Sequence, residues 1–397
     1  MCDLVCTLLV SSPKGRKWNQ LTGLFINNEF VDASNRTLIT SIYPATEKEI
    51  VTVQGASSED VDREVNAAKK ALKSTEWKKL RVTERGRLMT KLADLIEENK
   101  ELLATVDAWD DGPALACGNI IVLKAAEQTP LSILLLARFI KEAGFPPGVV
   151  KIINWIGREA DKVAFTGSTG TATRIMKMAA VGLKNITLET HADMEQAICT
   201  ATSRILVQLF VFEEILSQFR EQIKSVSVIG DQWSDNTFEG PQVTKQQYER
   251  VLSYVDIGKS EGAELVEGGE ACPGNGFFIK PTVFTKVSPN MRIYREEIFG
   301  PLVVIATLAT EEDGIAMAND TIYGLGSAVF TRDLERAHRV AAEIEAGMVW
   351  INSSQDCDYR IPFGGVKQSG IGRELGEAGL QAYSQVKAVH VNLGNRL

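Results

Sequence analysis

The apolar positions of the first hundred residues predict a hairpin followed by two amphipathic helices. Gly23–Ala33 is typical of a short hairpin with Asn27-Asn28 at its turn. Apolar side chains then recur at helical spacing from about Ser58, and a second helix is predicted from about Thr83. The apolar face of that second helix carries Leu88, Leu92, Leu95 and Ile96. Both helices are therefore expected to pack one face against a core.

A strand–helix–strand pattern comes next in the chain. Ile120–Leu123 is a continuous apolar run, as expected for a parallel strand that is buried on both faces. Thr129 is predicted to cap the following helix, with Pro130 at its first position and Gly144 at its end. Two further strands are predicted at Val149–Ile153 and Val163–Phe165. Strands that alternate with helices predict a doubly wound parallel sheet.

The second half of the chain repeats this alternation and predicts a second α/β unit. Strands are predicted at Ile205–Val207, Phe277–Ile279, Leu302–Ala306 and Ala328–Phe330, and helices at Lys245–Lys259 and Glu335–Glu345. The dense glycines between Pro362 and Glu374 indicate tight backbone turns. After them, Lys387–Leu393 alternates in the manner of an edge strand.

Composition narrows the class of protein. The chain has 397 residues and a net charge of −8, which argues against nucleic acid and anionic membrane surfaces as partners. Its six cysteines are scattered without a CxxC pair, which fits a reducing compartment and gives no zinc spacing. Leu4–Val10 is apolar but has no basic residues before it, and no stretch reaches a transmembrane length. We therefore expect a cytoplasmic protein without a metal site.

Two stretches carry candidate chemistry. Cys199 stands ahead of small and hydroxyl residues, which is a suitable setting for a thiolate nucleophile, although most cysteines are small buried hydrophobic residues. The turn Phe165–Thr169 leads from a strand into a helix, so its N–H groups could face a phosphate. It is neither a GxGxxG fingerprint nor a Walker loop, and the pattern alone favours a plain strand–helix turn.

Several stretches resemble the aldehyde dehydrogenase superfamily almost residue for residue. These are Gly118–Val150, Asp161–Thr169, Glu296–Pro301, Gly347–Asn352 and the tail from Pro362, with Ile186–Glu189 just upstream of Cys199. The resemblance covers nearly the whole chain. It implies two doubly wound Rossmann-like α/β domains and a truncated β tail for oligomerisation. The implied boundaries are 1–189 for NAD binding, 190–373 for catalysis and 374–397 for the tail.

The resemblance also implies a role for individual residues. Cys199 matches the nucleophile, which forms a hemithioacetal and then a thioester, and Glu189 matches the carboxylate that activates water. The residues that match cofactor contacts are Lys124, Glu127, Gly167, Ser168, Gln247, Arg250, Glu297 and Phe299. The carboxylate of Glu127 would accept both ribose hydroxyls and repel a 2′-phosphate, so NAD is expected in preference to NADP. The substrate tunnel would be lined by Asn352, Cys357 and Phe363.

The sequence departs from the family pattern at three places. Gly112 is followed directly by Pro113, so the family's Pro-Trp-Asn-Phe-Pro motif, whose asparagine helps to stabilise an oxyanion, is missing. Arg158–Ala160 replaces a longer helix, and Thr190–Ala192 replaces a Gly-Gly turn after Glu189. Three clean gaps in otherwise faithful sequence indicate lost exons or a faulty gene model.

These departures leave three functions open. The first is NAD-dependent oxidation of an aldehyde to its carboxylic acid, with a small-molecule aldehyde as substrate, which we favour. The second is a catalytically impaired relative with a binding or structural role, and the third is a thiol hydrolase that acts on esters through Cys199. Members of the family form homo-oligomers through a ribbon that includes the C-terminal strand. A discrete oligomer is doubtful here because the partner strands belong to the segment missing after Gly112.

Overall fold

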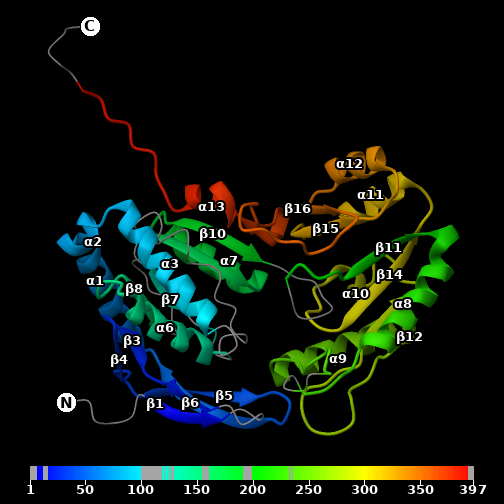
Figure 1. Cartoon of the computed structure of the whole chain (residues 1–397). Helices are drawn as coiled ribbons and strands as arrows, with labels where there is room; N and C mark the ends of the chain where they lie inside the picture. The colour runs from blue at the N-terminus through cyan, green and yellow to red at the C-terminus, as the bar shows by residue number, and fades with distance from the viewer. Residues whose placement is uncertain are drawn as a thin grey trace.

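A computed structural model of the chain describes residues 7–11, 17–99, 119, 121–124, 126, 129–153, 161–190, 199–231, 234 and 236–391 (Figure 1). These residues form two α/β lobes, and in Figure 1 the blue-to-green lobe lies to the left of the green-to-orange one. The prediction of an α/β fold with two such units is confirmed.

Three antiparallel hairpins open the first lobe. β1 (Thr7–Ser11) pairs with β2 (Lys17–Leu21), β3 (Leu24–Ile26) with β4 (Glu29–Val31), and β5 (Thr37–Tyr43) with β6 (Lys48–Gly55). Asn27 and Asn28 turn the β3–β4 hairpin with φ values of 51° and 63°, the conformation that a tight two-residue turn requires. The predicted hairpin is therefore confirmed.

The predicted amphipathic helices follow as α1 (Ser58–Lys73) and α3 (Val82–Glu98), with the short α2 (Thr75–Lys79) between them. Ser57 and Asp60 form a capping box at the start of α1. The predicted apolar face of α3 packs against the first-lobe core, which is built around Phe25, Phe145 and Ile152.

The predicted strand–helix–strand unit is present as β7 (Ile121–Lys124), α6 (Leu131–Ala143) and β8 (Val150–Ile153), with β7 and β8 parallel. Gly144 ends α6 with φ 93°, as predicted. The predicted cap is wrong, because Pro130 occupies the N-cap position of α6 and no side-chain hydrogen bond caps this helix. Thr129 therefore lies one residue too early to cap the helix.

A buried ion pair joins β8 to α1. The side chains of Lys151 and Glu64 are both fully buried, with 3.6 Å between Nζ and Oε2. The Lys151 ammonium also donates to the main-chain carbonyl of Glu64. Burial lowers the pKa of Lys151 to about 8, and the opposing charge of Glu64 limits that shift.

The strands that carry candidate site residues form a separate sheet in the first lobe. β9 (Lys162–Gly167) and β10 (Asn185–Thr190) are parallel and are linked by α7 (Thr169–Ala180). β17 (Gly370–Ile371) adds to β10 in the antiparallel sense, so the sheet order is β17-β10-β9. Among the described residues β8 and β9 are not paired, and the parallel strands of this lobe therefore belong to two sheets.

The second lobe is built on a sheet of order β11-β14-β13-β12. Its strands are β11 (Arg204–Gln208), β12 (Glu264–Glu267), β13 (Thr282–Thr285) and β14 (Leu302–Leu308). The accompanying helices are α8 (Phe212–Val226), α9 (Lys245–Ser260), α10 (Arg292–Arg295) and α11 (Glu311–Asn319). β15 (Gly326–Val329) and β16 (Met348–Ile351) form a separate parallel pair joined by α12 (Leu334–Glu343).

Two predicted strands are wrong within the described residues. Phe277–Ile279 forms only an isolated bridge from Ile279 to Ala271, because Gly274 and Gly276 turn the backbone with positive φ just before it. Its apolar residues are buried as loop residues instead, with Phe277 against Tyr248 at 5.8 Å between ring centroids. Lys387–Val391 forms no strand and projects from the molecule, as the red end of the ribbon in Figure 1 shows.

The glycine-rich segment 362–374 connects the two lobes. On one side, Gly370 lies opposite Glu189 of β10. On the other, the Val366 N–H donates to the Gly324 carbonyl and the Gly324 N–H donates to Ser369 Oγ, each at 2.9 Å. The helix after the segment, α13 (Gly376–Ala382), returns to the first lobe, where the Tyr383 carbonyl accepts from Asn119 at 2.8 Å.

A second contact joins the lobes at the β5–β6 turn. The Phe277 N–H of the second lobe donates to the Pro44 carbonyl at 3.1 Å. The Gly276 N–H donates to the carboxylate of Glu47 at 3.3 Å. In Figure 1 this contact lies at the bottom of the molecule and the glycine-rich segment lies at the top.

The backbone contact of Gly370 predicts a large loss of stability for Gly370→Ala. A Cβ at this position would lie 2.2 Å from the Leu188 carbonyl oxygen, at a φ of 146°. We expect a loss of about 2–4 kcal/mol in the free energy of unfolding, measured in urea. Gly86→Ala is the matched control: it is in the interior of α3 with no atom within 4 Å of the added Cβ. It should gain about 0.5–1 kcal/mol. Similar effects of the two substitutions would contradict this account.

Candidate active site

Three of the predicted site residues lie at the carboxyl ends of neighbouring parallel strands. In the register of β9 and β10, Glu189 lies opposite Thr166, and Thr190 opposite Gly167. Ser168 follows directly and caps α7, with its Oγ accepting from the Thr171 N–H at 3.4 Å. The structure therefore brings Glu189 and the Gly167–Ser168 turn to the same edge of one sheet, where α/β enzymes bind ligands.

The first turn of α7 is open to a ligand. It contains no acidic residue, and a Cβ added to Gly170 would meet no atom within 4 Å. The N-terminus of a twelve-residue helix with an accessible backbone can accept an anionic group. This geometry fits the predicted phosphate contact at Gly167 and Ser168.

A second group of predicted residues gathers around the segment 296–301 of the second lobe. The side chain of Gln247 donates to the Phe299 carbonyl at 2.7 Å, and Arg250 donates to the Glu297 carbonyl at 2.8 Å. Both donors belong to α9, where they lie one turn apart and face the same segment. In this structure Gln247 and Arg250 hold the main chain that carries Glu297 and Phe299.

The adjacent residues Glu296 and Glu297 have opposite electrostatic environments. Burial raises the pKa of Glu297 to about 7, although Arg250 pulls it down. The pKa of Glu296 is lowered, first by its hydrogen bonds from Arg292 and then by the Tyr254 hydroxyl, which donates at 2.6 Å. Glu296 is thus held as an anion, whereas Glu297 exchanges its proton near neutral pH.

Cys199 is half-buried in a turn that leads into β11. Ala201, two residues later, is 6 % exposed and belongs to the core of the second lobe. Arg204, the first residue of β11, donates to the carbonyls of Met317 and Ala318 at 3.2 Å and lies 5.0 Å over the ring of Tyr294. The chain that follows Cys199 is therefore firmly anchored in the second lobe.

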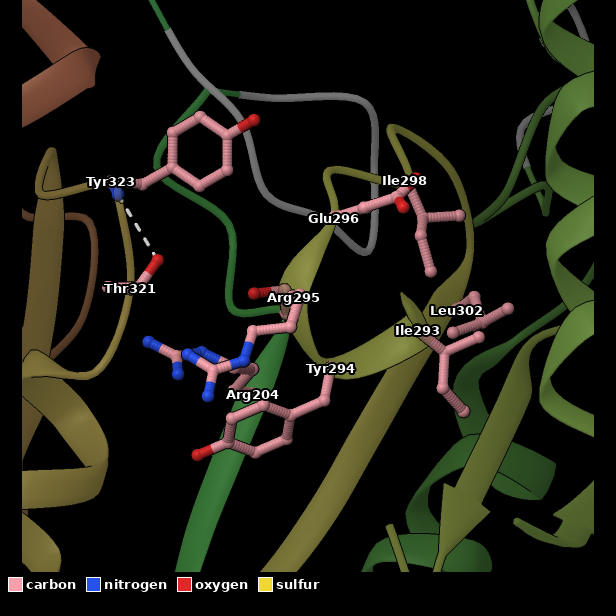
Figure 2. A pocket seen from close by; sticks show the side chains of 10 residues that line it. Arg204, Ile293, Tyr294, Arg295, Glu296, Ile298, Leu302, Thr321 and Tyr323 are labelled. Atoms are coloured by element: carbon pink, nitrogen blue, oxygen red, sulfur yellow. Dashed lines mark hydrogen bonds between the residues drawn. The ribbon is translucent and has the colours of Figure 1, made fainter. Parts of the chain in front are cut away.

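A small hollow lies at the start of β11 (Figure 2). Ile293, Tyr294, Ile298 and Leu302 supply its apolar lining, and its polar lining comes from Ser203, Arg204, Arg295, Glu296, Thr321 and Tyr323. The guanidinium groups of Arg204 and Arg295 lie 5.0 and 5.9 Å from the centre of the Tyr294 ring, and Thr321 and Tyr323 are on a neighbouring loop (Figure 2). None of the predicted site residues lines this hollow. Its polar residues come from separate stretches of the chain, and no local pattern in the sequence groups them.

The remaining predicted residues lie apart from these two groups or outside the described residues. Lys124 is exposed at the end of β7, in a different sheet from Glu189, and Glu127 lies outside the described residues. Asn352 and Cys357 are exposed on the loop after β16, where Asn352 Oδ1 accepts from the Thr331 N–H at 2.9 Å. Phe363 is half-buried and forms an isolated bridge to Glu374.

The part of the chain that the structure describes has neither a metal-binding cluster nor a membrane-spanning helix. No group of three or more histidine, cysteine, aspartate or glutamate side chains there could hold a metal ion. No helix in the same residues is both long enough and apolar enough to cross a membrane.

Two Rossmann-like lobes with candidate residues at strand ends are typical of nucleotide-binding enzymes. The sequence model of the aldehyde dehydrogenase family matches residues 30–112, 106–196 and 193–389. The chain belongs to the aldehyde dehydrogenase family. An aldehyde dehydrogenase of Aspergillus niger is 37 % identical, and the alignment covers 100 % of both chains. That of Alternaria alternata is also 37 % identical, over 98 % of this chain and 99 % of the relative.

Solved structures show the same family relationship. A single-substitution mutant of an aldehyde dehydrogenase from Bacillus cereus aligns with a TM-score of 0.90 and 35 % identity, over 94 % of this chain and 96 % of that one. An NAD⁺ complex of the Bacillus cereus enzyme aligns with a TM-score of 0.88 and 36 % identity over the same shares. The predicted family is confirmed, and aldehyde oxidation is the activity of that family.

The comparisons also locate segments that this chain lacks. The family matches in three pieces, with breaks near residues 106–112 and 193–196. The alignment to the Aspergillus niger enzyme runs over 500 positions, whereas this chain has 397 residues. These breaks fall where the sequence departs from the family pattern after Gly112 and after Glu189.

The contrast between Glu297 and Glu296 predicts opposite pH effects for two neighbouring substitutions. The folded state binds the Glu297 proton more tightly than the unfolded chain does, and this tighter binding stabilises the fold. The contribution is complete below about pH 4.5 and is lost as pH rises to 7. Glu297→Gln should match the wild type at pH 4 and exceed it by about 2–3 kcal/mol at pH 8.

Glu296→Gln is the matched control for this prediction. The folded-state pKa of Glu296 is lowered, so its stabilisation is present above about pH 4.5 and is lost on acidification. This variant should be less stable than the wild type at pH 8 and should approach it at acidic pH. Urea unfolding across this pH range measures both differences, and shifts of the same sign would refute the assignment.

Proposed function

We propose that this protein oxidises an aldehyde to its carboxylic acid with NAD, using Cys199 as the nucleophile and Glu189 as the base that activates water. The observation that carries the proposal is the shared sheet edge of Glu189 and the Gly167–Ser168 turn, in a chain of this family. That edge provides two groups that the reaction needs. The carboxylate can take a proton from water, and the helix N-terminus beside it can hold the pyrophosphate of NAD.

The described residues fit NAD at two places. The open N-terminus of α7 with Ser168 would hold the pyrophosphate, and Glu297 with Phe299 would meet the nicotinamide end. Gln247 and Arg250 would support that end through the main chain, and Lys124 and Glu127 would take the adenosine ribose. NAD, when bound, accepts a hydride from the substrate carbon. The carboxylate of Glu127 is the reason for preferring NAD to NADP.

The chain's own residues perform two steps. The Cys199 thiolate adds to the aldehyde carbonyl carbon, forming a C–S bond, and the loss of the hydride leaves a thioester on sulfur. Glu189 then takes a proton from water while the water oxygen attacks the thioester carbon. The C–S bond breaks, and the carboxylic acid and the thiolate are released. Asn352, Cys357 and Phe363 would line the path of the aldehyde.

A catalytically impaired relative is the second candidate, and the missing segments favour it. The absent Pro-Trp-Asn-Phe-Pro motif removes one oxyanion donor, which costs on the order of a hundredfold or more in rate. The break after Glu189 removes the turn that supports its carboxylate in the family. We therefore expect slow turnover.

Cys199→Ser and Cys272→Ser form a matched pair that tests the nucleophile. With an aldehyde and NAD, Cys199→Ser should lose at least about a hundredfold in NADH formation, because serine has no thiolate. Cys272→Ser should keep the wild-type rate, because Cys272 is not among the site residues and burial raises the pKa of its thiol.

Peptide mapping of the trapped acyl-enzyme should find the acyl group on Cys199. An acyl group mainly on Cys357 or Cys117, or equal rates for the two variants, would overturn the assignment. No NADH formation by the wild type would favour the impaired relative, and ester hydrolysis without any response to NAD would favour a thiol hydrolase.

We also propose that the protein works in the cytoplasm and assembles poorly. Its scattered cysteines are the reason for the first proposal. For the second, Val386, Val389 and Val391 are at least 72 % exposed on the tail. Uncovered apolar and edge groups favour non-specific pairing.

Sedimentation velocity over a range of concentrations should therefore show a monomer, a weak dimer or aggregates. A chain that ends at Ser384 should aggregate less, because it lacks the exposed valines but keeps α13 and the Tyr383 contact. A single stable tetramer at low micromolar concentration would show that the tail has another partner.

A further inference from the structure

We propose that Thr190 is a positioning residue for Glu189, which it serves by fixing the end of β10 through a hydrogen bond from its hydroxyl to the main chain of Gln368. The inference rests on the proposed function, in which Glu189 activates water. It adds a residue that follows the catalytic carboxylate directly in the chain and acts on it through the backbone.

The geometry around Thr190 carries this inference. Thr190 is the last residue of β10 and is 3 % exposed. Its Oγ1 donates to the Gln368 carbonyl at 2.5 Å. On one side Thr190 pairs with Gly167 of β9, and on the other the β10–β17 register ends with Glu189 opposite Gly370. The hydroxyl therefore extends the attachment of β10 to the glycine-rich segment by one residue beyond the paired backbone.

The short pairing of β10 with β17 makes this extra attachment important. β17 has only two residues, so the backbone register holds Leu188 and Glu189 alone on that side. Strand ends open more readily than strand interiors, and Glu189 is the penultimate residue of its strand. A buried hydroxyl that loses its partner is costly, so the Thr190 bond opposes this opening.

Opening of the strand end would slow the reaction by displacing the Glu189 carboxylate. A base must lie within hydrogen-bond reach of the water that it activates. Displacement of a reacting group by about 1 Å can lower a rate about a hundredfold. Loss of the Thr190 bond should therefore slow hydrolysis of the thioester while leaving attack by Cys199 intact.

Three variants separate positioning from general stability. Thr190→Val removes the hydroxyl at nearly constant shape, and Thr190→Ser keeps it. Thr187→Val is the matched control, because Thr187 is also in β10, is 4 % exposed and has its hydroxyl in a hydrogen bond from Lys162. It loses a buried hydrogen bond in the same strand, on the face that also carries Glu189, but away from the strand end.

The first measurement uses the full-length chain and p-nitrophenyl acetate, which acylates a thiolate without NAD. Thr190→Val should keep the burst of p-nitrophenol within about twofold and hydrolyse the acetyl-enzyme about 10- to 100-fold more slowly. Thr190→Ser and Thr187→Val should stay within about twofold of the wild type in both phases. The inference would be overturned if Thr190→Val hydrolysed the acetyl-enzyme at the wild-type rate, or if Thr187→Val slowed this hydrolysis as much as Thr190→Val does.

The second measurement does not depend on catalysis. Hydrogen exchange of the Glu189 and Thr190 amides should accelerate about tenfold or more in Thr190→Val, and not in Thr187→Val. If the wild type forms no acetyl-enzyme on Cys199, the proposed function fails and the exchange comparison alone decides the role of Thr190. Unchanged exchange in Thr190→Val would then overturn it.

Discussion

The close approach of main chains at the glycine-rich segment 362–374 is the constraint on which the candidate site depends. A Cβ at Gly370 would lie 2.2 Å from the Leu188 carbonyl oxygen, and one at Gly347 would lie 1.8 Å from the Gly364 carbonyl oxygen. Only glycine allows this packing. The first contact fixes β10 beside Glu189, and the second fixes the segment against the residue just before β16. One stretch of backbone thus aligns both lobes.

Packing also sets the charge of groups that look equivalent in the sequence. Glu296 is held as an anion by Arg292 and Tyr254, whereas its neighbour Glu297 is half-buried and has its pKa raised to about 7, chiefly by desolvation. Lys151 shows the same effect on a cation, because it is fully buried against Glu64. In each case the state of the group follows from the atoms that surround it, and these include atoms from distant parts of the chain, such as Tyr254 for Glu296 and Glu64 for Lys151.

Local signals in the sequence were sufficient for most of the fold. The Asn27-Asn28 hairpin, the helices near Ser58 and Thr83 and the end of α6 at Gly144 depend on adjacent residues, and all are confirmed. The strand predicted at Phe277–Ile279 is wrong because a short apolar run cannot distinguish a buried loop from a strand.

The site was harder to predict than the fold, because its contacts join distant residues. The bond between Thr190 and Gln368 spans 178 positions, and no local pattern indicates it. The residues of the hollow at the start of β11 are dispersed in the same way. The family resemblance supplied roles for the site residues, but not the partners that hold them in place.

The two contacts between the lobes have a mechanical consequence. One is the glycine-rich segment at the top of Figure 1, and the other is the pairing of Pro44 and Glu47 with the loop before Phe277 at the bottom. A body attached to another at two separated points keeps both attachments only when it rotates about the line that joins them. Rotation about any other axis would break at least one attachment. Motion that keeps both contacts is therefore a hinge about that line, which changes the distance between the facing sides of the two lobes.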